Sequence, residues 1–254
     1  MLVDYHVHGM GHGTYNHSRD DLAAFIQTGL SVNLKEIGFA EHDWYLNKIN
    51  WTNLSSIQAD FPQVAVRIGL EVDYFPEREK EIAGWLMKHP FDYVIGSVHH
   101  IGDWMFDHPD CVAEYQRWDI DDLYQVYFNL VARLVQSRLF DVIGHLDLIK
   151  IFGYRPQRSQ PEQMIEPVLK MIRQAGLVVE INTAGRYRPV AEVYPSEKIL
   201  TRCWEHDIPI TLSSDAHEPE QVGRDIGWAR ELARRIGYRQ IATFHRRQID
   251  FVSL

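Results

Sequence analysis

The sequence has few cysteines, no excess of positive charge and no long apolar run, and each absence excludes a class of protein. The two cysteines of the 254 residues, Cys111 and Cys203, lie far apart and outside any Cys-x-x-Cys pair. This spacing argues against a disulfide framework and against a thiolate zinc site. A net charge of −9 argues against a nucleic-acid-binding surface. Because no apolar run could span a bilayer and the first residues lack a secretion signal, we expect a cytoplasmic protein without membrane contact.

The sequence does have a regular alternation of short apolar runs and amphipathic segments. Seven runs rich in valine, isoleucine or leucine predict strands at residues 2–8, 36–40, 64–71, 93–98, 142–145, 178–182 and 208–213. Their near-continuous apolarity is typical of strands that are buried on both faces. Amphipathic segments between them predict helices at residues 18–30, 76–88, 120–137, 161–175, 196–205 and 219–236.

This alternation predicts parallel strands, which build either a closed barrel or a doubly wound sheet. Only a few strand ends feed the site of a doubly wound sheet, whereas every strand of a barrel ends at one central mouth. Polar residues follow all seven predicted strands, so the sequence favours an α/β fold with a distorted, seven-stranded, TIM-like (β/α)7 barrel. The length suits a single domain over residues 1–254. Residues 44–63 are a long excursion that we expect over the mouth.

The polar clusters at the strand ends contain the residue types that bind metals. Nine side chains are candidate ligands: His6, His8, His12, His42, Glu71, His99, His145, Asp215 and His217. Any single histidine among them is better explained as a hydrogen-bonded strand-end residue, but that explanation does not account for their recurrence at successive strand ends. A His-x-His pair points to opposite faces of a regular strand, so joint ligation by His6 and His8 requires the first strand to bend.

The ligand types and their number predict the metal and the substrate class. Imidazole nitrogen mixed with carboxylate oxygen favours Zn²⁺, Mn²⁺ or Fe²⁺ over Mg²⁺. Nine groups exceed what one ion takes, so we expect two or three divalent ions, preferably three, with Glu71 able to bridge neighbours. Three ions would keep about three net positive charges after two carboxylates and a bridging hydroxide are counted, which suits a phosphomonoester dianion. The expected partner is therefore a small phosphomonoester, and the oligomeric state stays open.

The motifs of this sequence resemble those of the PHP (polymerase and histidinol phosphatase) superfamily, specifically its stand-alone histidinol-phosphatases. The matching motifs, in family order, are His6-Val7-His8, Glu41-His42, Gly69-Leu70-Glu71, residues 91–99, Ile143-Gly144-His145-Leu146-Asp147, Asn182-Thr183-Ala184-Gly185 and Ser213-Ser214-Asp215-Ala216-His217. The resemblance implies a distorted seven-stranded barrel with a trinuclear centre of zinc, manganese or iron. It also implies hydrolysis of L-histidinol phosphate to L-histidinol and phosphate in histidine biosynthesis, with a metal-bridged hydroxide attacking phosphorus.

Eight of the nine candidate ligands occupy the family's ligand positions, and the ninth departs from them. Relatives usually have five residues between the second histidine of the first motif and the next ligand, whereas His12 follows after three. His17 is the alternative. We prefer His12 because Gly9, Gly11 and Gly13 allow the loop to tighten around it.

Loop residues near the expected mouth are candidates for binding substrate and for catalysis. Arg155, Arg186 and Arg188 are the candidates for phosphate, because a planar guanidinium matches paired phosphate oxygens. Four further residues could contact an imidazole or ammonium group: Trp44, Tyr45, Asp103 and Trp104. The candidate catalytic residues are Asp43, Asp215 and His217. Of these, Asp43 and His217 are possible proton donors to the leaving alkoxide, a role that the sequence leaves unassigned.

Three other functions remain open at this stage. The first is a PHP-type phosphoesterase that acts on nucleotides or on another small phosphomonoester. The second is an amidohydrolase or deaminase on a related barrel, but such enzymes usually carry a bridging lysine at a strand end, and Lys150 lies beyond its strand. The third is a barrel that binds metal without catalysis, which an intact ligand set with nearby arginines disfavours.

Overall fold

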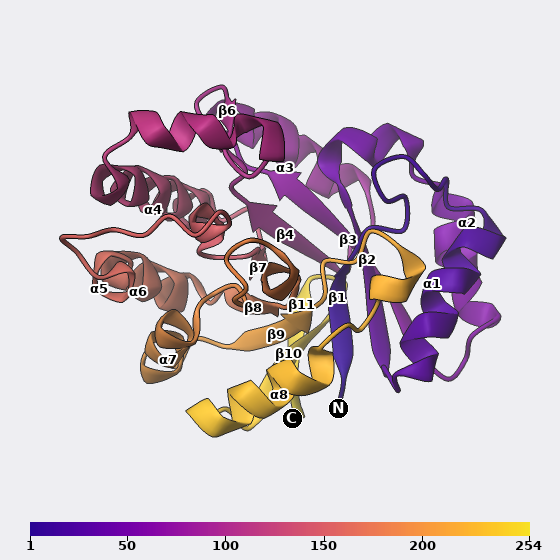
Figure 1. Ribbon diagram of the computed structural model, residues 1–254. Coiled ribbons are helices and arrows are strands. Elements are labelled where there is room, and N and C mark those ends of the chain that lie inside the picture. Colours follow the sequence, from indigo (N-terminus) through magenta and orange to yellow (C-terminus); the bar gives the residue numbers. More distant parts are fainter.

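The computed structural model describes all 254 residues, and seven parallel strands dominate it. They form one sheet in the order β1-β2-β3-β4-β7-β8-β9, curled into a barrel with helices packed around the outside (Figure 1). The strands are β1 (Val3–Val7), β2 (Glu36–His42), β3 (Ala65–Asp73), β4 (Tyr93–Ser97), β7 (Val142–Ile143), β8 (Val178–Asn182) and β9 (Ile210–Ser213). The predicted seven-stranded barrel and each of its strands are confirmed.

The barrel is distorted where its first and last strands meet. The only pairing of β1 with the segment after β9 is a parallel bridge between Val7 and Ala216. It is held by two backbone hydrogen bonds, from His8 N to Ala216 O at 2.7 Å and from Ala216 N to His6 O at 3.1 Å. The register of β1 against β2 also shifts between Asp4 and Val7. The first strand is therefore irregular, as joint ligation by its His-x-His pair requires.

Helices cover the outside of the barrel, and none of them combines the length and apolarity needed to cross a membrane. They are α1 (Arg19–Ser31), α2 (Trp51–Ser56), α3 (Glu79–Lys88), α4 (Ile120–Ser137), α5 (Pro161–Met164), α6 (Glu166–Ala175), α7 (Glu197–Glu205) and α8 (Ile226–Ile236). The helix predicted at 161–175 is broken into α5 and α6, because Pro167 has no N–H to continue the hydrogen-bond ladder. The helix predicted at 219–236 begins only at Ile226.

The excursion at residues 44–63 does not cover the mouth as the sequence led us to expect. Its helix α2 lies beside α1 on the outside of the barrel (Figure 1), where Leu54 and Ile57 are buried in the hydrophobic core. An ion pair between Arg19 of α1 and Asp60 ties the segment to that helix. Within the segment, Trp44 alone borders the mouth. The prediction failed because the apolar side chains of the segment need a partner, and the flank of α1 offers one.

Two antiparallel hairpins that the sequence analysis did not predict complete the fold. One is β10 (Gln240–His245) with β11 (Gln248–Ser253), which packs under the barrel. Its Phe244 joins Tyr5 and Tyr93 in a buried aromatic cluster with ring centroids 5.0 to 5.4 Å apart. The other is β5 (His100–Ile101) with β6 (Trp104–Met105), which follows the end of β4. The first hairpin fills the amino-terminal end of the barrel, and the second borders its carboxyl-terminal mouth.

Candidate metal centre

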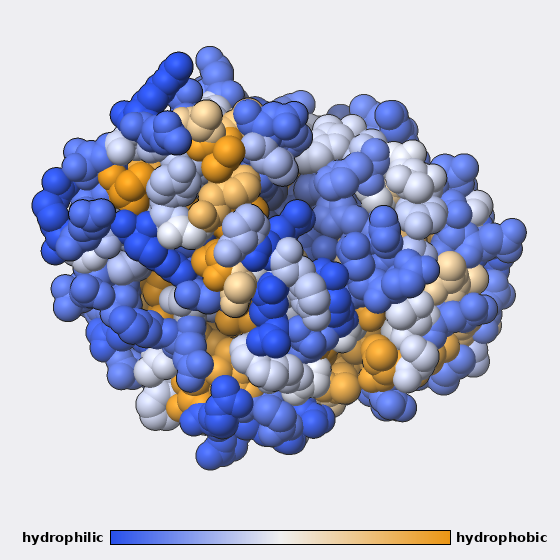
Figure 2. Space-filling model, in the orientation of Figure 1, coloured by the Kyte–Doolittle hydropathy of each residue, from blue (hydrophilic) through white to orange (hydrophobic).

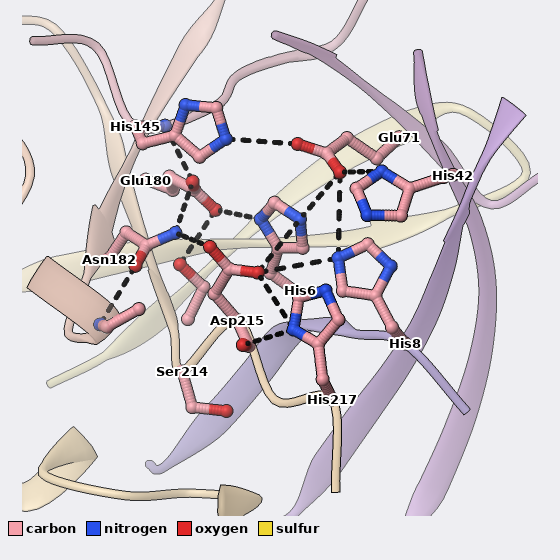
Figure 3. Close-up of polar contacts among 12 residues, drawn as sticks. His6, His8, His42, Glu71, His145, Glu180, Asn182, Ser214, Asp215 and His217 are labelled. Carbon is pink, nitrogen blue, oxygen red and sulfur yellow. Dashed lines mark hydrogen bonds and ion pairs between the residues drawn. The ribbon is translucent and has the colours of Figure 1, made fainter. Parts of the chain in front are cut away.

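The candidate ligands meet at the carboxyl ends of the strands. Figure 3 shows His6, His8, His42, Glu71, His145, Asp215 and His217 converging from both ends of the chain. Two of them depend on backbone that side-chain-bearing residues seldom adopt, because φ is +21° at His145 and +55° at Asp215. Such strained positions concentrate at functional sites. The loops after β7 and β9 therefore turn these two side chains back over the barrel axis.

Glu71 is the hub of the cluster. Its side chain is buried, and its carboxylate lies within 3.5 Å of ring nitrogens of five histidines: His6, His8, His42, His99 and His145. Asp215 provides a second carboxylate, whose Oδ1 lies 3.4 Å from His8 Nε2 and 3.8 Å from His6 Nε2. The arrangement offers two carboxylates to share among several ions.

Three adjoining groups have the geometry to hold an ion. They are His8 with His42 and His217, His6 with His8 and Glu71, and Glu71 with His99 and His145; in each group the ligand atoms lie within 4.8 Å of one another. Glu71 and His8 each belong to two groups, so neighbouring ions would share ligands. This overlap fits the expectation of two or three divalent ions.

Buried atoms without hydrogen-bond partners support the same assignment. The Nε2 atoms of His6, His8 and His217 and the Oε2 atom of Glu71 are buried and accept or donate no hydrogen bond. Leaving a buried polar atom unpaired costs about 1–3 kcal/mol. Four such atoms facing one another fit divalent cations, and nitrogen with oxygen donors suits zinc, manganese or iron.

The electrostatics of the cluster keep His8, His217 and Glu71 in the forms that bind metal. Burial, together with the neighbouring rings of His42 and His217, holds the pKa of His8 well below its usual range. Burial also lowers the pKa of His217 to about 4. Burial alone would raise the pKa of Glu71, but the surrounding imidazoles, His6 and His42 foremost, hold it well below its usual range. Neutral imidazole and ionised carboxylate are the protonation states that coordinate metals, and His8, His217 and Glu71 adopt them. His6 and His99 differ: burial alone would lower the pKa of each, but Glu180 beside His6 and Asp73 beside His99 hold it well above its usual range, so a metal ion would bind there in competition with a proton.

Glu180, in the middle of β8, orients two of the candidate ligands through hydrogen bonds, and the sequence analysis did not identify it as a site residue. Its side chain is fully buried and accepts hydrogen bonds from His6 Nδ1 at 2.9 Å, from the His145 backbone N–H at 2.6 Å and from Ser213 Oγ at 2.7 Å. By accepting the hydrogen bond from His6 Nδ1–H, Glu180 leaves Nε2 to face the centre. A charged residue inside an apolar strand was the signal that could have found it.

Two further supporting residues act on other ligands. Asp73 accepts a hydrogen bond from His99 Nδ1, which turns the opposite ring nitrogen toward Glu71. Asn182 donates to Asp215 Oδ2 at 3.1 Å. Asp73 could have been found from its spacing, because residues two apart in a strand point to the same face as Glu71 does.

The alternatives for the ninth ligand, His12 and His17, lie in different environments. His12 is exposed at the mouth, with its ring centroid 4.3 Å from that of His217. The loop tightens there as predicted, since Gly11 and Gly13 adopt positive φ. His17 is fully buried, and its Nε2 lies 2.8 Å from Glu41 Oε1. The structure thus brings His12 to the cluster and engages His17 elsewhere.

The candidate catalytic residues divide in the same way. Asp215 and His217 belong to the cluster and line its pocket, whereas Asp43 does not line it. Asp43 is buried and pairs with Arg78 at 2.9 Å. Burial raises the pKa of Asp43 to about 7, although Arg78 opposes the shift. Asp43 could hold a proton at neutral pH, but the structure pairs it with Arg78 outside the pocket.

A pocket of about 350 Å³ opens above the cluster. In the space-filling view, a hollow bordered mostly by hydrophilic residues lies near the middle of the face, beside a strip of hydrophobic residues (Figure 2). Besides the ligands, the lining includes Trp44, Met105, Asp107, Arg188 and Tyr194. The Arg188 side chain makes no ion pair, so its charge is free to meet a ligand. The pocket is large enough for a small substrate.

The other two candidate phosphate residues, Arg155 and Arg186, lie outside this pocket. Both line a separate surface hollow of about 560 Å³. Arg155 pairs with Glu192 at 2.7 Å, and Arg186 pairs with Asp225 at 2.7 Å. Arg186 also stacks over the Trp228 ring at 3.9 Å. Of the three arginines, the structure brings Arg188 alone to the metal cluster.

Comparisons with known proteins agree with this geometry. A model of the PHP domain family matches residues 4–184, which is well over half of the chain. A probable histidinol-phosphatase of Deinococcus radiodurans is 36% identical over 97% of this chain and 98% of its own length. The histidinol-phosphatase of Lactococcus lactis is 25% identical over 98% of this chain and 96% of its own length.

Solved structures extend the likeness to the three-dimensional fold. A crystal structure of histidinol phosphate phosphatase from Lactococcus lactis, complexed with zinc, L-histidinol and phosphate, superimposes with a TM-score of 0.83 over 98% of both chains. A structure of a putative histidinol phosphatase from Listeria monocytogenes, 19% identical over 89% of this chain and 99% of its own, gives 0.77 and supports the fold alone. The chain therefore belongs to the PHP domain family and, within it, to the metal-dependent histidinol-phosphatases.

Proposed function

We propose that this chain hydrolyses L-histidinol phosphate to L-histidinol and phosphate. The observation that carries the proposal is the cluster around Glu71, whose buried and unpartnered ligand atoms form the base of a pocket that also holds the unpaired Arg188. The Lactococcus lactis relative binds zinc with both products, and it matches this chain over nearly its full length. The cytoplasmic location remains a prediction.

We further propose that nine residues hold the ions, as the sequence predicted: His6, His8, His12, His42, Glu71, His99, His145, Asp215 and His217. When bound, the ions supply Lewis acidity and a water of lowered pKa as the nucleophile. Other side chains orient the metal ligands and bind the substrate. Glu180 and Asp73 orient His6 and His99, while Arg188 holds the phosphoryl group through charge-assisted hydrogen bonds.

The proposal that His12 rather than His17 completes the centre predicts different losses for the two variants. His12→Ala should lower the bound metal and kcat/KM roughly 10- to 100-fold, as loss of groups at a metal site typically does. Its exposure means that Tm of the metal-free protein should hardly change. His17→Ala should instead lower Tm, because it leaves Oε1 of the buried Glu41 without a partner, while the metal stoichiometry stays that of the wild type. Metal analysis and thermal unfolding of both variants decide the matter, and a metal loss in His17→Ala would reverse the assignment.

The function itself is tested by a phosphomonoester screen on protein of measured metal content. L-Histidinol phosphate should exceed mononucleotides and sugar phosphates in kcat/KM by at least about 100-fold, because only a substrate that fills the pocket gains its binding energy in the transition state. Comparable rates on all substrates would argue for a general phosphatase. A preference for mononucleotides would favour the alternative phosphoesterase.

A further inference from the structure

One carboxylate in the pocket has no partner and is not among the nine proposed metal ligands. Asp107 lines the pocket above the cluster, and its Oδ1 atom is buried without a hydrogen bond. No ion pair engages the side chain, and Asp107 is not among the nine proposed ligands. A buried carboxylate oxygen in this state costs free energy unless a ligand supplies a donor.

The loop that carries Asp107 is anchored rather than free. Phe106, the residue before it, is fully buried, and its backbone N–H donates to His99 O at 3.1 Å. The Phe106 ring packs edge-on against Tyr127, with centroids 5.5 Å apart. This hydrogen bond connects the neighbour of Asp107 to His99, the candidate ligand that lies shortly after β4. The backbone that carries the carboxylate is therefore fixed before any substrate arrives, which lowers the entropy lost on binding.

The pocket also contains an unpaired opposite charge. Arg188 lines it without an ion pair, and Arg188 and Asp107 do not pair with each other. Elsewhere on the molecule, arginines near carboxylates are paired, as Arg155 is with Glu192 and Arg186 is with Asp225. Two unpaired charges of opposite sign in one pocket match a zwitterionic ligand that carries an anion and a cation.

Resting on the function proposed above, we propose that Asp107 is a specificity-determining residue that binds the ammonium group of the substrate. The phosphate of L-histidinol phosphate would face the metal cluster and Arg188, while its ammonium donates to the Asp107 carboxylate. Of the two nitrogen groups in that substrate, the ammonium is fully charged at neutral pH, whereas the imidazole is largely neutral there. A full positive charge offsets a carboxylate with one buried oxygen better than a neutral N–H does.

This assignment differs from the one that the sequence suggested. Asp103 was a candidate for contacting an imidazole or ammonium group, but it is exposed near the β5–β6 turn and does not line the pocket. Asp107 lies four residues further along the chain, just beyond β6. Asp103 therefore serves as a matched control, since it is a nearby carboxylate that faces solvent.

The test compares two substrates that differ only in the amino group: L-histidinol phosphate and 3-(imidazol-4-yl)propyl phosphate. Wild-type protein should prefer the amino-bearing substrate by roughly 10- to 100-fold in kcat/KM, the value of a charge-assisted hydrogen bond. Asp107→Asn should abolish this preference by raising KM for L-histidinol phosphate, with kcat and KM for the analogue near the wild-type values. Asp107→Glu should retain part of the preference, and Asp103→Asn should retain all of it.

Three results would overturn the proposal. One is a preference that survives in Asp107→Asn, and another is an equal loss on both substrates, which would indicate a structural role. The third is a fall in bound metal in Asp107→Asn, which would make Asp107 part of the metal centre. If the wild-type protein did not hydrolyse L-histidinol phosphate efficiently, the proposed function itself would fail, whatever Asp107 does.

Discussion

Replacement of Glu71 by alanine is expected to lower kcat/KM by at least about 1000-fold. The carboxylate lies within 3.5 Å of five histidine rings and belongs to two of the three groups that could hold an ion. Its loss would remove a shared ligand, and the metals' stabilisation of transition-state charge amounts to several kcal/mol, at about 1.4 kcal/mol for each factor of ten. Metal analysis of the purified variant should show fewer ions per chain than in the wild-type protein.

Thermal unfolding separates loss of metal from loss of fold in the Glu71→Ala variant. Metal that binds the folded state alone stabilises it, so a chelator should lower Tm of the wild-type protein. The same chelator should lower Tm of Glu71→Ala by much less, while circular dichroism still reports a folded barrel. Glu77→Ala, an exposed carboxylate after the same strand, is the matched control and should behave as wild type. Full activity in Glu71→Ala would refute the assignment of the centre.

Replacement of Arg188 by alanine is expected to lower kcat/KM roughly 10- to 100-fold, because it removes charge-assisted hydrogen bonds to the phosphoryl group. Arg188 is the arginine in the metal pocket, and no carboxylate neutralises it. Arg188→Lys should recover part of the loss, since it restores the charge without the planar fork. The metal content should remain that of the wild-type protein.

Arg155→Ala and Arg186→Ala are the matched controls for the Arg188 variant. Both side chains line the separate hollow and are paired with carboxylates, so their removal should change stability more than kcat/KM. Kinetics measured well below each variant's Tm decide between the three arginines. A larger loss of kcat/KM in Arg186→Ala than in Arg188→Ala would assign phosphate binding to Arg186 instead of Arg188.

Much of the fold and the ligand cluster could be predicted because both repeat along the sequence. Buried parallel strands are nearly all apolar, so a polar residue such as His42 or Glu71 marks the place where a strand reaches the mouth. The ends of parallel strands in a barrel meet at one rim, so residues far apart in the chain could be grouped without knowledge of their contacts. The position of each ligand followed from where its strand ends.

Residues whose role depends on a partner could not be predicted in this way. Glu180 and Asp73 are buried carboxylates, and only the rings of His6 and His99 opposite them explain why they are there. In the loop after β8, Arg186 and Arg188 are two residues apart, yet they line different hollows. Which arginine faces the metals depends on local backbone angles and on the stacking of Arg186 over Trp228. Neither the backbone angles nor the stacking contact can be inferred from the spacing of residues in the sequence.

The bridge between Val7 and Ala216 gives the metal centre a particular relation to protein synthesis. His6 and His8, at the end of the first strand, leave the ribosome before Asp215 and His217, which follow the last strand of the barrel. Because the same backbone pairing that joins the first strand to the last segment aligns these side chains, a truncated chain lacks part of both the barrel seam and the ion-binding cage. Tight metal uptake would therefore report that translation has reached the end of the barrel.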